Sequence, residues 1–154
     1  MRIDDATCRR LLAAARHGYL ATAGDDQQPR VVPVTFALVP ATDEIVTAVD
    51  HKPKTTSALR RLRDVAENPR AALLVDRYDD DWSQLWWVRA TGTITVERLP
   101  SDTADDTTDT DARWSAAIDV LAGKYPQYVQ HRPTDAVLRL QVDRWTGWSA
   151  TPIG

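Results

Sequence analysis

The stretch YLATAGDDQQPRVVPVTFALVPATDEIVTAV, residues 19–49, decides the fold class of this chain. It predicts three strands, at 19–23, 30–39 and 44–49, because runs rich in Val, Thr and Ala alternate with turn clusters of Gly, Asp, Gln and Pro. A parallel sheet would need a crossover helix between successive strands, and these short connections leave no room for one. The stretch therefore predicts an antiparallel sheet that closes into a small barrel.

Helical and further strand patterns surround these three strands. An amphipathic helix is predicted from Asp4 or Asp5, with Cys8 on its apolar face and Gly18 as its C-terminal stop. Beyond a second helix, which begins at about Thr55, the pattern predicts strands at 70–76 and 85–96, a helix around 114–125 and a last strand at 137–144. The acidic, Thr-rich segment 100–111 is expected to be a mobile loop.

Size and composition exclude several classes of protein. The 154 residues contain no internal repeat and predict a single domain, residues 1–154, while the net charge of −3 argues against a nucleic-acid-binding protein. No apolar run is long enough to span a membrane, and the N-terminus does not resemble a signal peptide. Cys8 is the only cysteine, so no internal disulfide forms, and we expect a cytoplasmic protein.

The start of the second helix is a candidate anion site. The segment Asp50-His51-Lys52-Pro53-Lys54-Thr55-Thr56-Ser57 follows a strand and opens an amphipathic helix that ends at Asn68-Pro69. A helix start carries free N–H groups and a partial positive charge, so with two lysines beside it this segment suits a phosphate; a solvated basic turn is the alternative. The helix also carries three arginines that we expect on a solvated face, namely Arg60, Arg61 and Arg63.

Pro33 lies inside the second predicted strand, where it cannot donate a backbone hydrogen bond. This position predicts a sheet edge or a gap in the sheet. Exposed backbone groups of Val31, Val32 and Val34 could then bind the polar edge of a flat heterocycle, although an ordinary edge strand has the same pattern. The three isolated histidines and the single cysteine predict no metal site. No nucleophile elbow, P-loop or dinucleotide fingerprint is present, so no catalytic residue is predicted.

Large aromatic side chains are expected on the face of the sheet that does not form the core. Alternation along the strand 85–96 places Trp87 and Arg89 on that face, and the last strand places Trp145 there as well. Exposed tryptophans are unfavourable in water, and interfaces are enriched in Trp and Arg. We therefore predict a two-fold symmetric homodimer.

Four segments together resemble the split β-barrel flavin and deazaflavin oxidoreductases, the group named after pyridoxamine 5'-phosphate oxidase. They are RVVPVT at 30–35, TAVDHKPK at 47–54, NPRAALLVD at 68–76 and WVRATG at 87–92. The sequence is most similar to the actinobacterial branch that uses coenzyme F420, a deazaflavin, and the resemblance covers residues 5–148. It implies an antiparallel, FMN-binding-protein-like split β-barrel with peripheral helices (α+β). It also implies a homodimer whose two cofactors lie in the grooves between subunits.

The resemblance also implies roles for particular residues. The segment 30–35 would lie along the cofactor ring and ribityl chain, Lys52, Lys54 and Thr55 would hold the phosphate, and tryptophans would cover the groove. The resulting candidate cofactor-binding residues are Arg30, Val31, Val32, Pro33, Val34, Thr35, Thr47, Val49, His51, Lys52, Lys54, Thr55, Trp87, Arg89, Trp145 and Trp148.

The implied activity is hydride transfer between reduced F420 and a small conjugated acceptor such as an enone or a quinone. FMN oxidases of the group carry a lysine where this sequence has Thr35, and its absence favours the deazaflavin. The alternatives are an FMN-dependent oxidoreductase, a protein that carries deazaflavin without catalysis, and a haem-binding member of the group.

Overall fold

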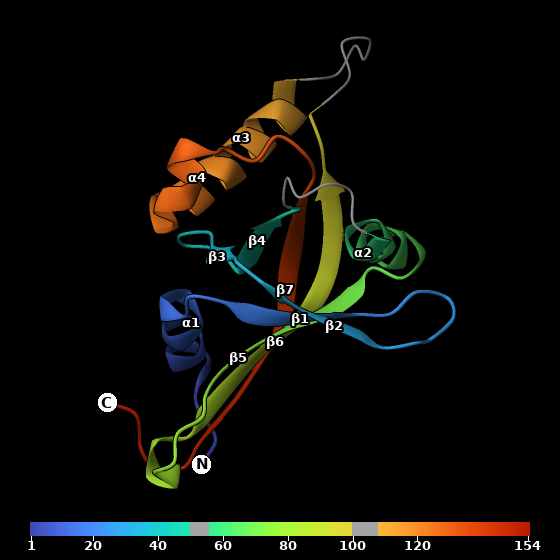
Figure 1. Cartoon of the computed structure of the whole chain (residues 1–154). Helices are drawn as coiled ribbons and strands as arrows, with labels where there is room; N and C mark the ends of the chain where they lie inside the picture. The colour runs from blue at the N-terminus through green and yellow to red at the C-terminus, as the bar shows by residue number, and fades with distance from the viewer. Residues whose placement is uncertain (50–55, 100–107) are drawn as a thin grey trace.

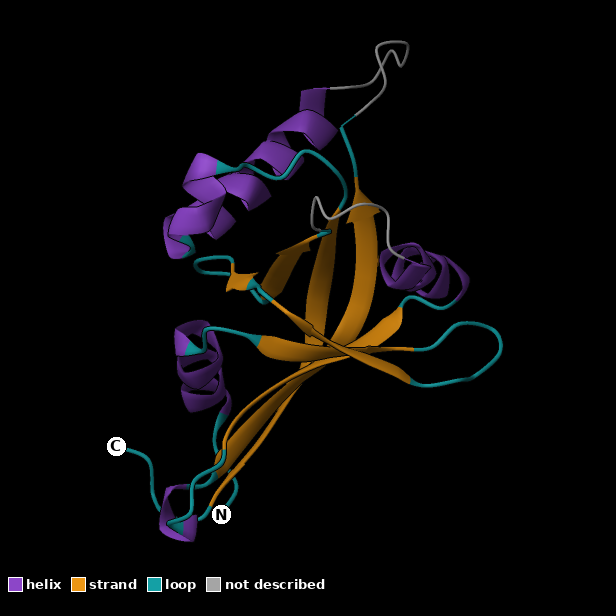
Figure 2. Ribbon diagram, viewed as in Figure 1, coloured by secondary structure: helices purple, strands orange, loops and turns teal. Residues whose placement is uncertain are grey.

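Antiparallel strands form one curled sheet in the computed structural model, which describes residues 1–49, 56–99 and 108–154 (Figures 1 and 2). The strand order in this described part is β2-β1-β5-β6-β7-β4-β3. The strands are β1 Gly18–Thr22, β2 Arg30–Val34, β3 Ala37–Leu38, β4 Glu44–Ala48, β5 Arg70–Arg77, β6 Trp86–Glu97 and β7 Val137–Ser149. The fold is a split β-barrel with peripheral helices, and this confirms the predicted fold class.

The expected strand at 30–39 is divided, and its two parts lie at opposite edges of the sheet. β2 pairs with β1 at one edge, and β3 pairs with β4 at the other. Between them, the Tyr125 hydroxyl accepts a hydrogen bond from Phe36 N at 3.1 Å and lies 2.9 Å from Phe36 O. These contacts satisfy backbone groups that have left the sheet. Pro33 lies on the edge strand β2, as its missing N–H predicts.

The helices cover the two ends of the curled sheet. α3 Thr108–Lys124 and α4 Pro126–Gln130 pack together near β3 and β4, whereas α2 Thr56–Glu67 lies on the other side, near the β1–β2 turn (Figure 1). Residues 108–111 therefore belong to α3 and not to the expected loop 100–111, whose other residues lie outside the described part. A short 3₁₀ helix, η1 Trp82–Gln84, joins β5 to β6. None of the described helices is long and apolar enough to span a membrane.

The first helix, α1 Asp5–Ala14, is capped as the sequence predicts but ends earlier. The Asp4 side chain accepts a hydrogen bond from Thr7 N at 2.8 Å, and Cys8 is fully buried. Gly18 is the first residue of β1 and does not cap the helix. A Cβ at this position would lie 2.9 Å from Leu74 O, so the glycine allows the backbone of β1 to approach β5 closely.

A β-bulge reverses the side-chain alternation of β7. Thr91 pairs with Arg144, but the next residue, Gly92, pairs with Val142, which leaves Asp143 unpaired in the ladder. Beyond the bulge, Trp145 therefore faces the core, where it is 6% exposed. The predicted outward orientation of Trp145 is wrong, because strict alternation does not allow for an extra residue.

A second core lies between the sheet and α3, with Trp114, Ile118 and Leu121 fully or almost fully buried. A buried ion pair adjoins it: Arg139 Nε of β7 lies 2.6 Å from Glu97 Oε1 of β6. Arg139 also lies 2.9 Å from Glu44 Oε2 of β4. The charged groups thereby join three strands beneath the start of α3.

Candidate functional site

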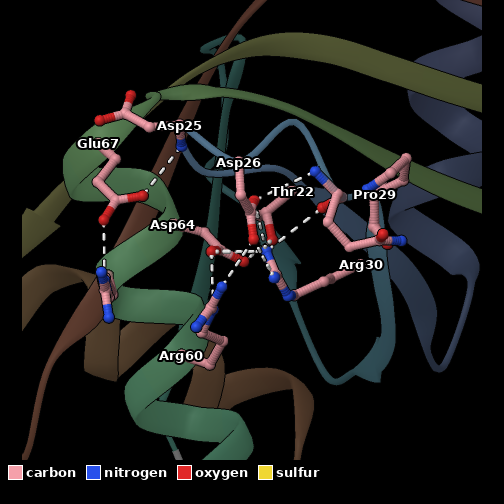
Figure 3. A network of polar contacts seen from close by, with 10 residues as sticks. Thr22, Asp25, Asp26, Pro29, Arg30, Arg60, Asp64 and Glu67 are labelled. Atoms are coloured by element: carbon pink, nitrogen blue, oxygen red, sulfur yellow. Dashed lines mark hydrogen bonds and ion pairs between the residues drawn. The ribbon is translucent and has the colours of Figure 1, made fainter.

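A cluster of arginines and aspartates joins β2 to α2 (Figure 3). Arg30 donates to Asp26 Oδ2 in the β1–β2 turn at 2.6 Å and to Asp64 Oδ1 of α2 at 2.9 Å. Arg60 donates to the same Asp26 oxygen at 2.8 Å, and its Nε lies 3.4 Å from Asp64 Oδ1. Asp64 is buried and also accepts from the Thr22 hydroxyl at 3.4 Å. Each arginine therefore contacts two carboxylates, which fix its orientation.

A cavity of about 290 Å³ lies beside this cluster, between β2 and α2, and Arg61 faces it. Its lining consists of Thr22, Arg30, Val31, Val32, Arg60, Arg61 and Asp64. Burial lowers the pKa of the Arg61 guanidinium, and nothing in the described part of the chain accepts a hydrogen bond from its Nε. A buried N–H donor without an acceptor is unfavourable, so this cavity is suited to a ligand with an acceptor oxygen, such as a phosphate.

The expectation of a solvated arginine face on α2 is wrong for two of its three members. Arg60 is bound to aspartates and Arg61 lines the cavity, whereas the Arg63 side chain is 68% exposed and pairs with Glu67 at 2.8 Å. The buried side of α2 includes Asp64 and Val65, and Leu59 is 53% exposed. The sequence contained one signal for this arrangement, namely Asp64, a single aspartate close to the three arginines. An aspartate is buried only where cationic groups pair with it.

The other candidate residues of β2 lie along the edge of the sheet. β2 pairs only with β1 among the described strands, so its second edge has no strand partner. Val31 is 62% exposed and Pro33 is also exposed, whereas Val34 is buried. This open edge could accept the polar atoms of a planar ligand, as its backbone groups are not all used within the sheet.

Two further candidate residues, Thr47 and Val49, lie near the end of β2 or in the core. The Thr47 hydroxyl donates to Thr35 O at 2.7 Å, which fixes the chain at the point where it leaves β2. Val49 is buried in the core. The remaining candidates of this region, His51, Lys52, Lys54 and Thr55, lie outside the described residues.

Trp87, Arg89 and Trp148 lie on the same face of the sheet as Pro33. The cross-strand register runs from Pro33 through Tyr19 and Leu74 to Arg89, and directly paired residues share a face. Trp87 pairs with Trp148, and the Arg89 guanidinium lies 5.8 Å from the Trp87 ring centre. Trp148 is 40% exposed. Trp145 is not part of this group, because it faces the core.

A larger cleft, of about 800 Å³, opens at the far end of β2, beside Thr35. Its lining combines aromatic and basic side chains, namely Arg16, Thr35, Tyr125, Gln127, Tyr128, His131 and Arg132. The Thr35 and Tyr128 hydroxyls are hydrogen-bonded at 2.7 Å. Of these residues only Thr35 belongs to the predicted site, although a run of Tyr, His and Arg after the predicted helix 114–125 was an available signal.

Lys124 lies next to this cleft, with its amine over the Phe36 ring at 4.1 Å. Burial and the neighbouring Arg16 lower the pKa of Lys124 to about 8. Elsewhere, residues 1–49, 56–99 and 108–154 contain no group of three or more His, Cys, Asp or Glu side chains that could hold a metal ion.

The sequence model of the pyridoxamine 5'-phosphate oxidase family matches residues 5–149. The chain belongs to this family. A comparison with curated proteins gives no match.

Solved structures agree with the family assignment at the level of the fold. A conserved hypothetical protein from Mycobacterium tuberculosis is 19% identical with a TM-score of 0.67, covering 99% of this chain and 92% of that one. An FAD-binding protein from Mesorhizobium loti is 21% identical with a TM-score of 0.62, covering 96% and 93%. An FAD-binding protein from Mycobacterium smegmatis is 17% identical with a TM-score of 0.58, covering 96% of each chain. At these identities the likeness shows the fold alone.

In this member of the pyridoxamine 5'-phosphate oxidase family, two hollows lie at opposite ends of β2, and each is lined by at least one of the candidate residues. The arginine cavity lies at Arg30 and the aromatic cleft lies at Thr35. An extended strand rises about 3.3 Å per residue, so roughly 16 Å separates the two positions. The open edge of β2 connects them.

Proposed function

We propose that the protein is an F420-dependent oxidoreductase that transfers a hydride between reduced deazaflavin and a small conjugated acceptor such as an enone or a quinone. The observation that carries this proposal is the buried Nε of Arg61, which has no acceptor among the described residues and lies at one end of an open strand edge. This arrangement suits a ligand that combines a phosphate with a planar heterocycle.

The residues present fit such a cofactor. Arg30, Arg60 and Arg61 would hold its phosphate. Lys52, Lys54 and Thr55, which precede α2 in the sequence, would also bind the phosphate. His51 remains a proposed cofactor-binding residue. The open edge of β2 would hold the ring. Bound deazaflavin supplies the hydride chemistry, and the protein supplies orientation and a site from which water is excluded.

The cleft beside Thr35 is the proposed site of the acceptor. Tyr125 and Tyr128 provide aromatic walls for a planar conjugated molecule, and Arg16 provides positive charge for a carbonyl or an acidic group. Thr35 itself supports the choice of deazaflavin, because FMN oxidases that the sequence resembles carry a lysine at this position.

A homodimer is part of this proposal. Val31, Tyr19 and Trp148 are exposed on one face of the sheet, at 62%, 37% and 40%, and Trp87 and Arg89 lie on the same face. A second copy of the chain would cover these side chains and form the other wall of the cofactor groove. We place this dimer in the cytoplasm, as the single buried cysteine, Cys8, suggests.

Titration with F420 and with FMN in parallel tests the cofactor assignment. Quenching of tryptophan fluorescence reports both affinities, and oxidation of reduced F420 by a panel of enones and quinones reports activity. We expect F420 to bind at least about tenfold more tightly than FMN, a difference of about 1.4 kcal/mol. Tighter binding of FMN would assign the protein to the flavin-dependent alternative.

A matched pair of arginine variants tests the site. Arg61→Ala should weaken F420 binding about tenfold to a hundredfold, since a charge-assisted hydrogen bond contributes roughly 1.5–3 kcal/mol. Arg63→Ala removes an exposed arginine from the same helix and should leave the affinity within about threefold of the wild-type value. Equal effects of the two substitutions would refute a phosphate site at Arg61.

A further inference from the structure

We infer that the hydroxyl of Tyr128, a residue of α4, donates a hydrogen bond to the carbonyl oxygen of the acceptor, and that Thr35 positions this hydroxyl. Both residues line the cleft of about 800 Å³ at the far end of β2. The inference rests on the proposed function, because it takes this cleft as the acceptor site. It names the group that recognises a conjugated carbonyl compound there.

The hydroxyls of Thr35 and Tyr128 carry one proton more than their mutual contact uses. Their oxygens lie 2.7 Å apart, a distance at which one hydroxyl donates and the other accepts. Each hydroxyl has one proton to donate. Whichever of the two donates, the other therefore keeps a proton that has no acceptor among the residues the structure describes. The pair offers this one donor to a molecule in the cleft.

Tyr128 is the stronger donor of the two. A phenol is more acidic than an aliphatic hydroxyl, so its proton forms the stronger hydrogen bond to a ligand oxygen. When Thr35 donates to Tyr128, the phenol proton is the one that remains free. A hydroxyl that accepts a hydrogen bond also becomes a better donor, because the two bonds polarise each other. The favoured arrangement thus runs from Thr35 through Tyr128 to the carbonyl oxygen.

Neighbouring contacts hold the pair in place. The Thr35 carbonyl accepts a hydrogen bond from the Thr47 hydroxyl at 2.7 Å. The Tyr128 ring packs edge-to-face against Tyr125, with 5.7 Å between the ring centres. Tyr125 is itself fixed, because its hydroxyl accepts from Phe36 N at 3.1 Å and lies 2.9 Å from Phe36 O. A donor oriented in advance stabilises the negative charge that develops on a carbonyl oxygen during reduction, without rearrangement of the protein.

The other described residues of the cleft suit the same oxygen. The Arg16 guanidinium also lines the cleft and lies 5.0 Å from the centre of the Tyr125 ring. None of the described lining residues is an aspartate or a glutamate, so no carboxylate among them would repel an oxygen that gains negative charge. The two tyrosine rings provide apolar surface for the conjugated part of the molecule.

Two small aromatic probes test this donor by their binding to the full chain. 4-Nitrophenolate has a conjugated oxyanion, as the reduced acceptor does, and 4-nitrotoluene has a methyl group in place of that oxygen. Tyr128→Phe keeps the ring and removes the hydroxyl. Its affinity for 4-nitrophenolate should fall about tenfold to a hundredfold, since the lost hydrogen bond is to a charged oxygen, while that for 4-nitrotoluene should not change. The absorption of bound 4-nitrophenolate should move to longer wavelength, because its oxyanion loses a hydrogen bond.

Two further variants complete the experiment. Thr35→Val removes the hydroxyl that positions Tyr128 and should weaken 4-nitrophenolate binding only about twofold to fivefold, because Tyr128 keeps its own proton. In the double variant the loss should equal that of Tyr128→Phe alone, since the two hydroxyls act as one unit. Tyr78→Phe is the control: it removes the hydroxyl of a tyrosine that is 76% exposed between β5 and η1, and it should leave both affinities unchanged.

The outcomes separate this inference from the proposed function. A wild-type protein that neither binds F420 nor oxidises its reduced form with any acceptor refutes the proposed function. A protein that binds F420, but whose 4-nitrophenolate affinity and spectrum are the same in Tyr128→Phe, refutes the role of Tyr128. An equal loss of affinity for 4-nitrotoluene also refutes it, because the substitution would then act on the shape of the cleft. A larger loss in Thr35→Val than in Tyr128→Phe refutes the choice of Tyr128 as the donor.

Discussion

Replacement of Trp145 and Trp148 by alanine should have opposite consequences, although only two residues separate them. Trp145 is 6% exposed, donates from Nε1 to Asp43 Oδ1 at 3.3 Å and lies 5.3 Å from the Arg9 guanidinium. Truncation of a buried tryptophan costs about 3–5 kcal/mol of the free energy of unfolding. For a chain of this length about 4 kcal/mol corresponds to a fall in melting temperature of roughly 8–16 °C. Trp148 is 40% exposed, so Trp148→Ala should cost less than about 1 kcal/mol.

Urea unfolding followed by far-ultraviolet circular dichroism, at one protein concentration, measures both losses. Trp145→Phe serves as a control, since it keeps most of the buried apolar surface and should cost about 1–2 kcal/mol. Trp148→Ala should instead weaken dimerisation and F420 binding, as measured by light scattering and fluorescence titration on the same samples. A larger stability loss for Trp148→Ala than for Trp145→Ala would refute the bulge-induced reversal of β7.

Three further changes test other parts of the fold by the same unfolding assay. Gly92→Ala should cost about 3 kcal/mol, because a Cβ would clash with the backbone oxygen of Gln141 in the adjacent strand. Glu97→Gln should cost about 3 kcal/mol, because it leaves the buried Arg139 with less compensation, though Glu44 remains 2.9 Å away. Lys124 has a folded-state pKa of about 8, below its unfolded value of 10.5, so the folded state releases its proton first. Wild-type stability should therefore rise relative to Lys124→Met as the pH increases from 8 to 10.5.

For each of these three substitutions, one result would contradict the prediction. A Gly92→Ala protein as stable as the wild type would mean that the two strands can separate locally without cost. An unaffected Glu97→Gln protein would mean that Arg139 is satisfied by Glu44 alone. For Lys124, a constant difference between the two proteins across pH 7 to 10.5 would show that the amine is fully solvated.

The sequence predicted the order and type of the main elements, because they follow from local alternation and turn chemistry. It did not predict the division of the strand 30–39, which depends on the hydroxyl of Tyr125, 89 positions further along the chain from Phe36. The orientation of Trp145 depends on the bulge at Asp143, which is a property of the pairing between two strands. These features arise from contacts between distant residues, which a periodic pattern does not contain.

The candidate site was predicted less completely than the fold. Arg30 and Pro33 were identified from the strand motif, and the structure places both on the open edge of the sheet. Arg60 and Arg61 were predicted to face solvent, because the buried face of a helix is predicted from its apolar residues. A buried aspartate does not contribute to that pattern. Asp64 turns this side of α2 toward the arginine cluster, and only the packed structure reveals its partners.

Pro33 also determines which kinds of molecule the open edge of β2 can accept. An incoming peptide strand would need a regular series of donors and acceptors along this edge, and a proline interrupts that series. A compact heterocycle needs only two or three neighbouring backbone groups and is not affected by the interruption. The exposed edge therefore remains available to a small cofactor while it resists the edge-to-edge association that leads to aggregation.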